Sequence, residues 1–142
     1  ILAKRIKTDI AYIDPPYNSR QYSDMYHLLE SLVEWKKLKV HGVAKKVKDR
    51  SNTKSLYCTK EARNTFANLI ENLNTKYIVI SFNNMGERGV GRSQAKISND
   101  EIIEILSQRG RVKIFEEDFR QFTTGKTIME EHKEILYVCK TK

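Results

Sequence analysis

The residues whose types and spacing best suit chemistry are Asp14-Pro15-Pro16-Tyr17, near the start of this 142-residue sequence. Adjacent prolines lack N–H groups and hold the backbone extended, so their carbonyl oxygens stay available to a ligand. The Asp14 carboxylate and the Pro15 carbonyl give two acceptors that match the two N–H donors of an exocyclic amino group. The Tyr17 ring offers a surface on which a planar base can stack. The alternative is a strand-ending turn in which Asp14 only caps a neighbouring backbone group.

The elements around these four residues favour a ligand site. The apolar run over residues 8–14 ends at the proline pair and predicts a buried strand. In open α/β sheets, ligands bind at the carboxyl ends of strands, which is where Asp14 stands. We therefore expect the four residues to face a cleft at the edge of a sheet.

Helices and strands alternate along the rest of the chain. Apolar side chains at helical spacing predict helices from Ser23 toward Leu38 and over residues 61–73. Ser98 and Glu101 form the capping box of a third helix, which Gly110 closes. Further strands are predicted over residues 77–82, 112–116 and 134–139. This order predicts an α/β fold with a mainly parallel sheet, the last two strands forming an antiparallel hairpin at its edge.

The net charge of +8 is concentrated in one segment. Residues 36–63 contain ten Lys or Arg and two acidic residues, whereas the remaining sequence has equal numbers of both signs. Within this segment, residues 39–59 lack any sustained period and are predicted to form an exposed basic loop. Such a cluster attracts a polyanion, although a solvated loop that only aids solubility has the same composition.

The motif and its surroundings resemble a known family. A DPPY sequence at the end of a strand is the signature of amino-directed DNA methyltransferases. The runs DPPYNSRQY at 14–22, YHLLE at 26–30 and YIVISFNN at 77–84 are similar to the Dam-like and FokI-type modification methylases. The resemblance implies a partial Rossmann-like S-adenosylmethionine-dependent methyltransferase fold. It also implies methyl transfer from S-adenosylmethionine to the exocyclic amine of a flipped adenine in double-stranded DNA, within a restriction–modification system.

The resemblance also implies roles for individual residues. Asp14, Pro15, Pro16 and Tyr17 would be catalytic, and Asp14, Tyr17 and Asn18 would contact the cofactor. The residues expected to contact nucleic acid are basic, and they are Lys45, Lys46, Lys48, Arg50, Arg88, Arg92 and Lys126.

A Dam-like enzyme carries its glycine-rich cofactor loop before the DPPY motif, which here begins at residue 14. We therefore expect residues 1–142 to be a single domain, the C-terminal catalytic portion of a methyltransferase. The cofactor-binding N-terminal portion would lie upstream or be supplied separately. Two other functions stay open at this point, a non-catalytic nucleic-acid-binding module and a methyltransferase that acts on RNA or a protein glutamine.

Other site classes find little support in the sequence. The run at 86–93 approaches a phosphate-binding loop, but Arg92 replaces its lysine and the next helix starts late, so a DNA-facing loop is expected instead. Cys58 and Cys139 have no metal-like spacing, and no metal site is expected. No stretch is apolar enough to enter a membrane, and with two unpaired-looking cysteines this indicates a cytoplasmic protein.

Overall fold

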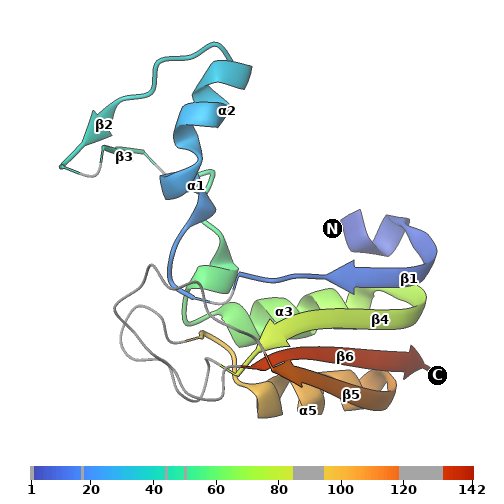
Figure 1. Ribbon diagram of the computed structural model, residues 1–142. Helices are drawn as coiled ribbons and strands as arrows, with labels where there is room; N and C mark the ends of the chain where they lie inside the picture. Colours follow the sequence, from blue (N-terminus) through green and yellow to red (C-terminus); the bar gives the residue numbers. More distant parts are fainter. Residues whose placement is uncertain (1, 17, 44, 50, 85–94, 119–132) are drawn as a thin grey trace.

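The computed structural model describes residues 2–16, 18–43, 45–49, 51–84, 95–118 and 133–142. Its centre is a four-stranded sheet with the order β1-β4-β6-β5 (Figure 1). The strands are β1 (Lys7–Ile13), β4 (Asn74–Asn83), β5 (Gly110–Asp118) and β6 (Lys133–Thr141). All four strands that the sequence predicted are therefore present. The prediction that the first of them is buried is wrong, because β1 lies at an edge of the sheet and contains no buried residue.

The sheet is mixed rather than mainly parallel. β1 and β4 pair in parallel, whereas β6 pairs antiparallel with both β4 and β5. The predicted antiparallel pair of the last two strands is present. Of these two strands β5 is at an edge of the sheet and β6 is not, because β6 lies between β5 and β4. The reason is visible in β6 itself, where Leu136 and Val138 alternate with the buried Ile135, Tyr137 and Cys139. A strand that is apolar on both faces is better placed inside a sheet than at its edge.

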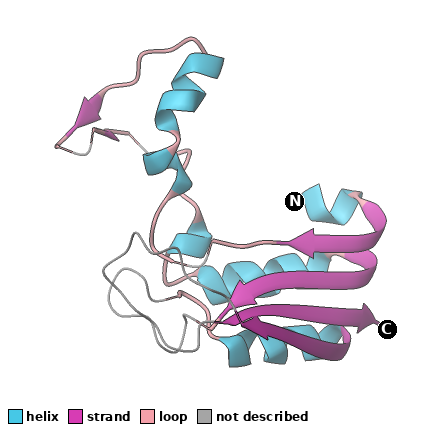
Figure 2. Ribbon diagram, viewed as in Figure 1, coloured by secondary structure: helices cyan, strands magenta, loops and turns pink. Residues whose placement is uncertain are grey.

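Two helices, α3 (Ala62–Asn72) and α5 (Asn99–Arg109), pack on the same face of the sheet (Figure 2). Both were predicted from the sequence. The core between helices and sheet consists of fully buried apolar side chains, among them Phe66, Ile70, Ile78, Ile80, Phe82, Ile102, Leu106 and Tyr137. No helix in the described ranges is long and apolar enough to cross a bilayer.

Helix α5 begins and ends for different physical reasons. At its start the capping box is confirmed, since the Ser98 N–H donates to Glu101 Oε2 at 2.8 Å and the Glu101 N–H donates to Ser98 Oγ at 3.2 Å. At its end, Gly110 has the extended φ of 170° rather than the left-handed conformation of a glycine cap. β5 begins at this residue, and a Cβ there would overlap the Lys140 carbonyl oxygen of β6. Gly110 is thus required by a close approach of two strands.

Residues 22–54 form a projection that we call the arm, which rises away from the sheet (Figure 1). It contains two helices, the one-turn helix α1 (Tyr22–Met25) and α2 (His27–Val33). It also contains the short strands β2 (Val40–His41) and β3 (Lys46–Val47). The single helix predicted from Ser23 toward Leu38 is therefore wrong in extent. Neither α1 nor α2 contains a buried residue, so no tertiary packing holds a longer helix together.

The basic segment 39–59 has more structure than the predicted loop. β2 and β3 pair antiparallel, and the Lys48 N–H donates to the Lys39 carbonyl at 2.9 Å. A short 3-10 helix, η2 (Leu56–Cys58), follows the arm, and Val47 and Cys58 are buried. A second 3-10 helix, η1 (Leu2–Arg5), precedes β1. The rest of the segment is largely exposed, as predicted.

Candidate active site

The DPPY motif lies where two parallel strands end together. Ile13, the last residue of β1, pairs with Ile80 of β4, and Asp14 follows at once. Asp14 is exposed, Pro15 is buried and Pro16 is half-buried. Pro15 is thus packed against the protein, whereas the residue Asp14 is accessible to solvent. This arrangement places a hydrogen-bond acceptor on a fixed backbone at the carboxyl edge of the sheet, as the sequence predicted.

Tyr17 and Asn18 come directly after the two prolines. Tyr17 is outside the described residues, so its predicted stacking role stays a prediction. Asn18 is half-buried, and its Oδ1 accepts a hydrogen bond from the Arg20 N–H at 2.9 Å. Its oxygen therefore stabilises a local turn of the kind that Asn commonly forms. The Asn18 NH2 group is the part of this side chain that suits contact with a ligand.

The end of β4 forms the second wall of the same edge. Asn83 is buried, and Asn84 joins β4 to β6, because its Oδ1 accepts from the Lys133 N–H at 3.1 Å. The Asn84 N–H also donates to the Lys133 carbonyl at 3.3 Å. Asn84 therefore joins β4 to the start of β6 at this edge of the sheet.

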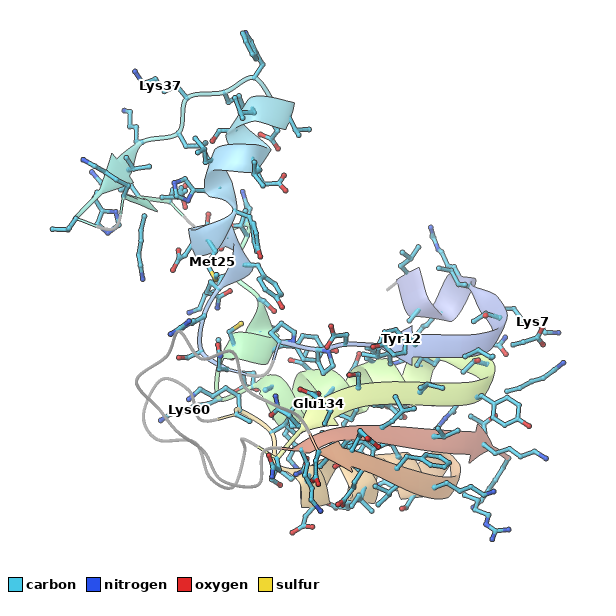
Figure 3. All side chains as sticks on the ribbon, in the orientation of Figure 1. Lys7, Tyr12, Met25, Lys37, Lys60 and Glu134 are labelled. Carbon is cyan, nitrogen blue, oxygen red and sulfur yellow. The ribbon has the colours of Figure 1, made fainter. Side chains whose placement is uncertain are left out.

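The basic residues predicted to contact nucleic acid are on the arm or outside the described residues. Lys45, Lys46 and Lys48 are exposed around β3, whereas Arg50, Arg88, Arg92 and Lys126 lie outside the described residues. The arm's Met25 and Lys37 lie far from Tyr12 and Glu134 of the sheet (Figure 3). The DPPY motif and the described basic residues among those predicted thus lie in two separate parts of the molecule.

The three described lysines differ in their surroundings. Lys46 Nζ lies 3.3 Å from Asp24 Oδ2, and this ion pair ties β3 to α1. Lys45 has a left-handed φ of 46° and donates its N–H to the Gly42 carbonyl at 3.2 Å, which closes the tip of the hairpin. No ion pair involves Lys45 or Lys48 within the described ranges. These two lysines are therefore better suited than Lys46 to bind phosphate.

A residue that the sequence did not single out holds the base of the arm. Gln21 is buried, and its side-chain amide bonds twice to the backbone of Ser55, 34 positions away. The thiol of Cys58 donates to the Arg20 carbonyl at 3.2 Å beside this contact. A lone glutamine next to tyrosine and arginine carries no sequence signal for such a contact, because its partner is backbone.

The two cysteines are free thiols in apolar surroundings. Cys58 and Cys139 are both buried, and burial raises the pKa of each thiol above its usual range. Thiols of this kind react slowly with external reagents. The described residues contain no group of three or more His, Cys, Asp or Glu side chains that could hold a metal ion.

Comparison with known proteins identifies the family to which the chain is similar. Residues 1–88 match the family described as D12 class N6 adenine-specific DNA methyltransferase. The chain is 41% identical over 108 residues to the modification methylase StsI of Streptococcus sanguinis, an alignment that covers 73% of this chain and 16% of StsI. It is 35% identical over 133 residues to the type II methyltransferase M.NlaIII of Neisseria lactamica, with 93% of this chain and 36% of that protein covered.

A third similar protein is also a DNA modification enzyme by name. The type II methyltransferase M.FokI of Planomicrobium okeanokoites is 32% identical over 145 residues, which covers 98% of this chain and 21% of M.FokI. The chain thus spans between 16% and 36% of the length of these three relatives. No solved structure matches the chain. Since the family match covers more than half of the chain and includes the DPPY motif, the chain belongs to the D12 class of N6 adenine-specific DNA methyltransferases.

Proposed function

We propose that this chain is the catalytic portion of a methyltransferase that methylates adenine at N6 in double-stranded DNA. The observation that carries the proposal is the position of Asp14, Pro15 and Pro16 at the shared carboxyl edge of β1 and β4. Family membership supports the reaction, and the relatives named as type II methyltransferases support a place in a restriction–modification system.

The proposed chemistry follows from two acceptors held at one place. The amine of adenine is a poor nucleophile because its lone pair is delocalised into the ring. Hydrogen bonds to the Asp14 carboxylate and the Pro15 carbonyl would draw the nitrogen toward tetrahedral geometry. These bonds strengthen as positive charge develops on nitrogen in the transition state, and an interaction of that kind lowers the barrier.

S-adenosylmethionine, when bound, supplies an electrophilic methyl group to the amine. The residues of this edge fit such a cofactor, since the exposed Asp14 carboxylate suits a positively charged ligand and the Asn18 NH2 group can donate to it. Tyr17 is proposed to cover the target base after it has left the stack. Most contacts to the cofactor would come from protein outside these 142 residues.

The arm is proposed to hold the DNA while the edge of the sheet acts on one base. Lys45 and Lys48 are exposed on either side of β3, where they can neutralise phosphates without reading sequence. Arg50, Arg88, Arg92 and Lys126 are proposed as further phosphate contacts. Because a base inside a duplex cannot reach Asp14, the DNA has to be held while one adenine is flipped out.

The uncovered face of the sheet supports the proposal of a partial Rossmann-like methyltransferase fold. Large apolar side chains are exposed on the face opposite α3 and α5, and they are Ile10, Tyr12, Tyr77, Phe115 and Leu136. Sheets of α/β proteins normally carry helices on both faces. We propose that residues 1–142 form one catalytic domain whose open face is covered by the cofactor-binding portion of the methyltransferase, in the same chain or in a separate one.

This packing can be tested with one substitution in two contexts. Tyr12→Asp is expected to lower the stability of the complete methyltransferase by about 2 kcal/mol, because it places a charge under the covering layer. In the 142-residue segment alone, where Tyr12 is 62% exposed, the same change should cost less than about 0.5 kcal/mol. Equal costs in both contexts, measured by urea unfolding, would contradict the proposed cover.

Methyl transfer is tested with the complete protein, labelled S-adenosylmethionine and duplex DNA. Asp14→Ala should reduce transfer to adenine by at least about 100-fold, because it removes an acceptor that acts in the transition state. Asp9→Ala is the matched control, since Asp9 is an exposed aspartate near the start of β1, the strand that Asp14 follows, and forms an ion pair with Lys76 at 2.7 Å. DNA binding without any transfer by the wild type would instead support a non-catalytic binding module.

A further inference from the structure

We propose that Gln21 is a positioning residue that fixes the arm relative to Asp14. This inference rests on the proposed function, in which the arm holds DNA for chemistry at the sheet edge. It assigns a role to a residue that contacts neither the DNA nor the cofactor in that proposal. The contact between Gln21 and Ser55, together with the neighbouring contact between Cys58 and Arg20, is called the neck below.

The neck joins the two ends of the arm through backbone groups. Gln21 Nε2 donates to the Ser55 carbonyl at 3.1 Å, and the Ser55 N–H donates to Gln21 Oε1 at 2.7 Å. One planar amide therefore satisfies both polar groups of one backbone residue, as a neighbouring strand would. Gln21 is only 8% exposed, so water competes little for these bonds.

Among the described residues, the helices of the arm contribute no side chain to the core of the sheet body. Helices α1 and α2 bury no residue, and Lys46–Asp24 is an ion pair within the arm. On the other side of the neck, η2 packs against α3 and thereby connects Ser55 to the sheet body. Within the described part of the chain, the neck is thus a point at which the arm is attached to the packed sheet body.

The position of the neck links the two proposed activities. Gln21 follows Asp14 by seven residues, so the same short segment carries the catalytic edge and one end of the arm. If the neck opens, the lysines of the arm sample many positions, and their effective concentration near a DNA bound at Asp14 falls. Loss of the neck should therefore weaken productive DNA binding more than it slows the chemical step.

The first test follows the thiols of Cys58 and Cys139 in the complete protein. Gln21→Met keeps a side chain of similar size but removes both hydrogen bonds. Cys58 at the neck should then react about tenfold faster with a thiol reagent, the size expected for two lost hydrogen bonds. Cys139 in β6 should keep its wild-type rate, because it is fully buried in the sheet core. Gln108→Met, the same change at an exposed position of α5, should alter neither rate.

The second test separates positioning from simple support of the fold. Gln21→Met should raise the KM for DNA about tenfold and change kcat by less than about twofold, because Asp14 itself is unchanged. Equal increases at Cys58 and Cys139, or a kcat that falls as much as kcat/KM, would assign Gln21 to general folding and overturn the inference. An unchanged KM with unchanged labelling of Cys58 would overturn it as well.

A third variant gives a rescue that only the hydrogen-bond geometry predicts. Gln21→Glu retains the acceptor for the Ser55 N–H, but its ionised carboxylate opposes the Ser55 carbonyl. Cys58 labelling in this variant should be fast at pH 8 and should approach the wild-type rate near pH 5, as the carboxyl group gains the proton that it can donate. The absence of any recovery relative to wild type would contradict the proposed contact. A wild-type protein without methyl transfer would contradict the proposed function alone, since the labelling experiments do not depend on activity.

Discussion

The sheet body and the arm of this molecule are stabilised in different ways. In the body, α3 and α5 cover one face of β4 and β6 with fully buried side chains such as Phe66, Ile80 and Tyr137. In the arm, Val47 is buried and the helices expose nearly all of their apolar side chains. The body is therefore fixed by packing, whereas the arm depends on a few polar contacts. A rigid support for chemistry and a separate basic projection for DNA are consistent with this difference.

The largest expected effect compares one buried and one exposed aliphatic residue. Ile80→Ala in β4 should reduce the free energy of unfolding by about 2–5 kcal/mol, because Ile80 is fully buried and its loss leaves a cavity. Val33→Ala at the end of α2 should change it by less than about 0.5 kcal/mol, since Val33 is 85% exposed. Urea unfolding of both variants measures the difference. Similar costs would show that the arm shares the packed core.

One glycine in the sheet body and one in the arm provide a second comparison of the two regions. Gly110→Ala should destabilise the protein by about 1–3 kcal/mol, because the new Cβ meets the Lys140 carbonyl oxygen of the neighbouring strand. Gly42→Ala should cost about 1 kcal/mol at most, since only its φ of +70° opposes a side chain and nothing lies within 4 Å. Thermal unfolding of the two variants provides the measurement. If Gly42→Ala lowered the stability more than Gly110→Ala, the result would contradict the close approach of Gly110 to Lys140.

The smallest expected effect concerns charge. The association constant for DNA falls as the salt concentration rises, and the slope of its logarithm against the logarithm of salt concentration counts phosphate contacts. Replacing Lys45 and Lys48 together by alanine should make this negative slope smaller in magnitude by about 2, because two phosphate contacts are lost. Lys140 and Lys142 provide a control with the same change in net charge, at the sheet edge opposite Asp14. Removing them should leave the slope within about 0.5 of the wild type. Equal changes in slope would mean that net charge, and not the arm, determines DNA binding.

Sequence patterns predicted the body far better than the arm. The alternating residues of β4 and β6 and the helical spacing in α3 and α5 directly reflect burial, so their positions followed from periodicity. The place of β6 between β4 and β5 could not be read in this way, because periodicity reports which face is buried and not which strand is the neighbour. The α2 stripe through Leu28 and Leu32 predicted packing that the structure does not contain.

The candidate site was predictable where it depends on local sequence. Asp14 and the two prolines stand at the end of β1 because the proline pair lacks the N–H donors that continued pairing with β4 would need. The contact of Gln21 with Ser55 was not predictable, since it joins a side chain to backbone over 34 positions. The pairing of Lys46 with Asp24 was also unforeseen, because their spacing gives no sign that β3 returns beside α1.

We propose that the carboxyl edge of the sheet performs the chemistry and that the arm binds the DNA. The most direct test is single-turnover methyl transfer by the complete protein at saturating duplex DNA, with DNA affinity measured in parallel. Asp14→Asn should lower the saturated rate by at least about 100-fold and leave the affinity within about threefold. The Lys45→Ala and Lys48→Ala double variant should weaken the affinity and retain the saturated rate. An Asp14→Asn variant that transfers methyl groups at the wild-type rate would contradict the account.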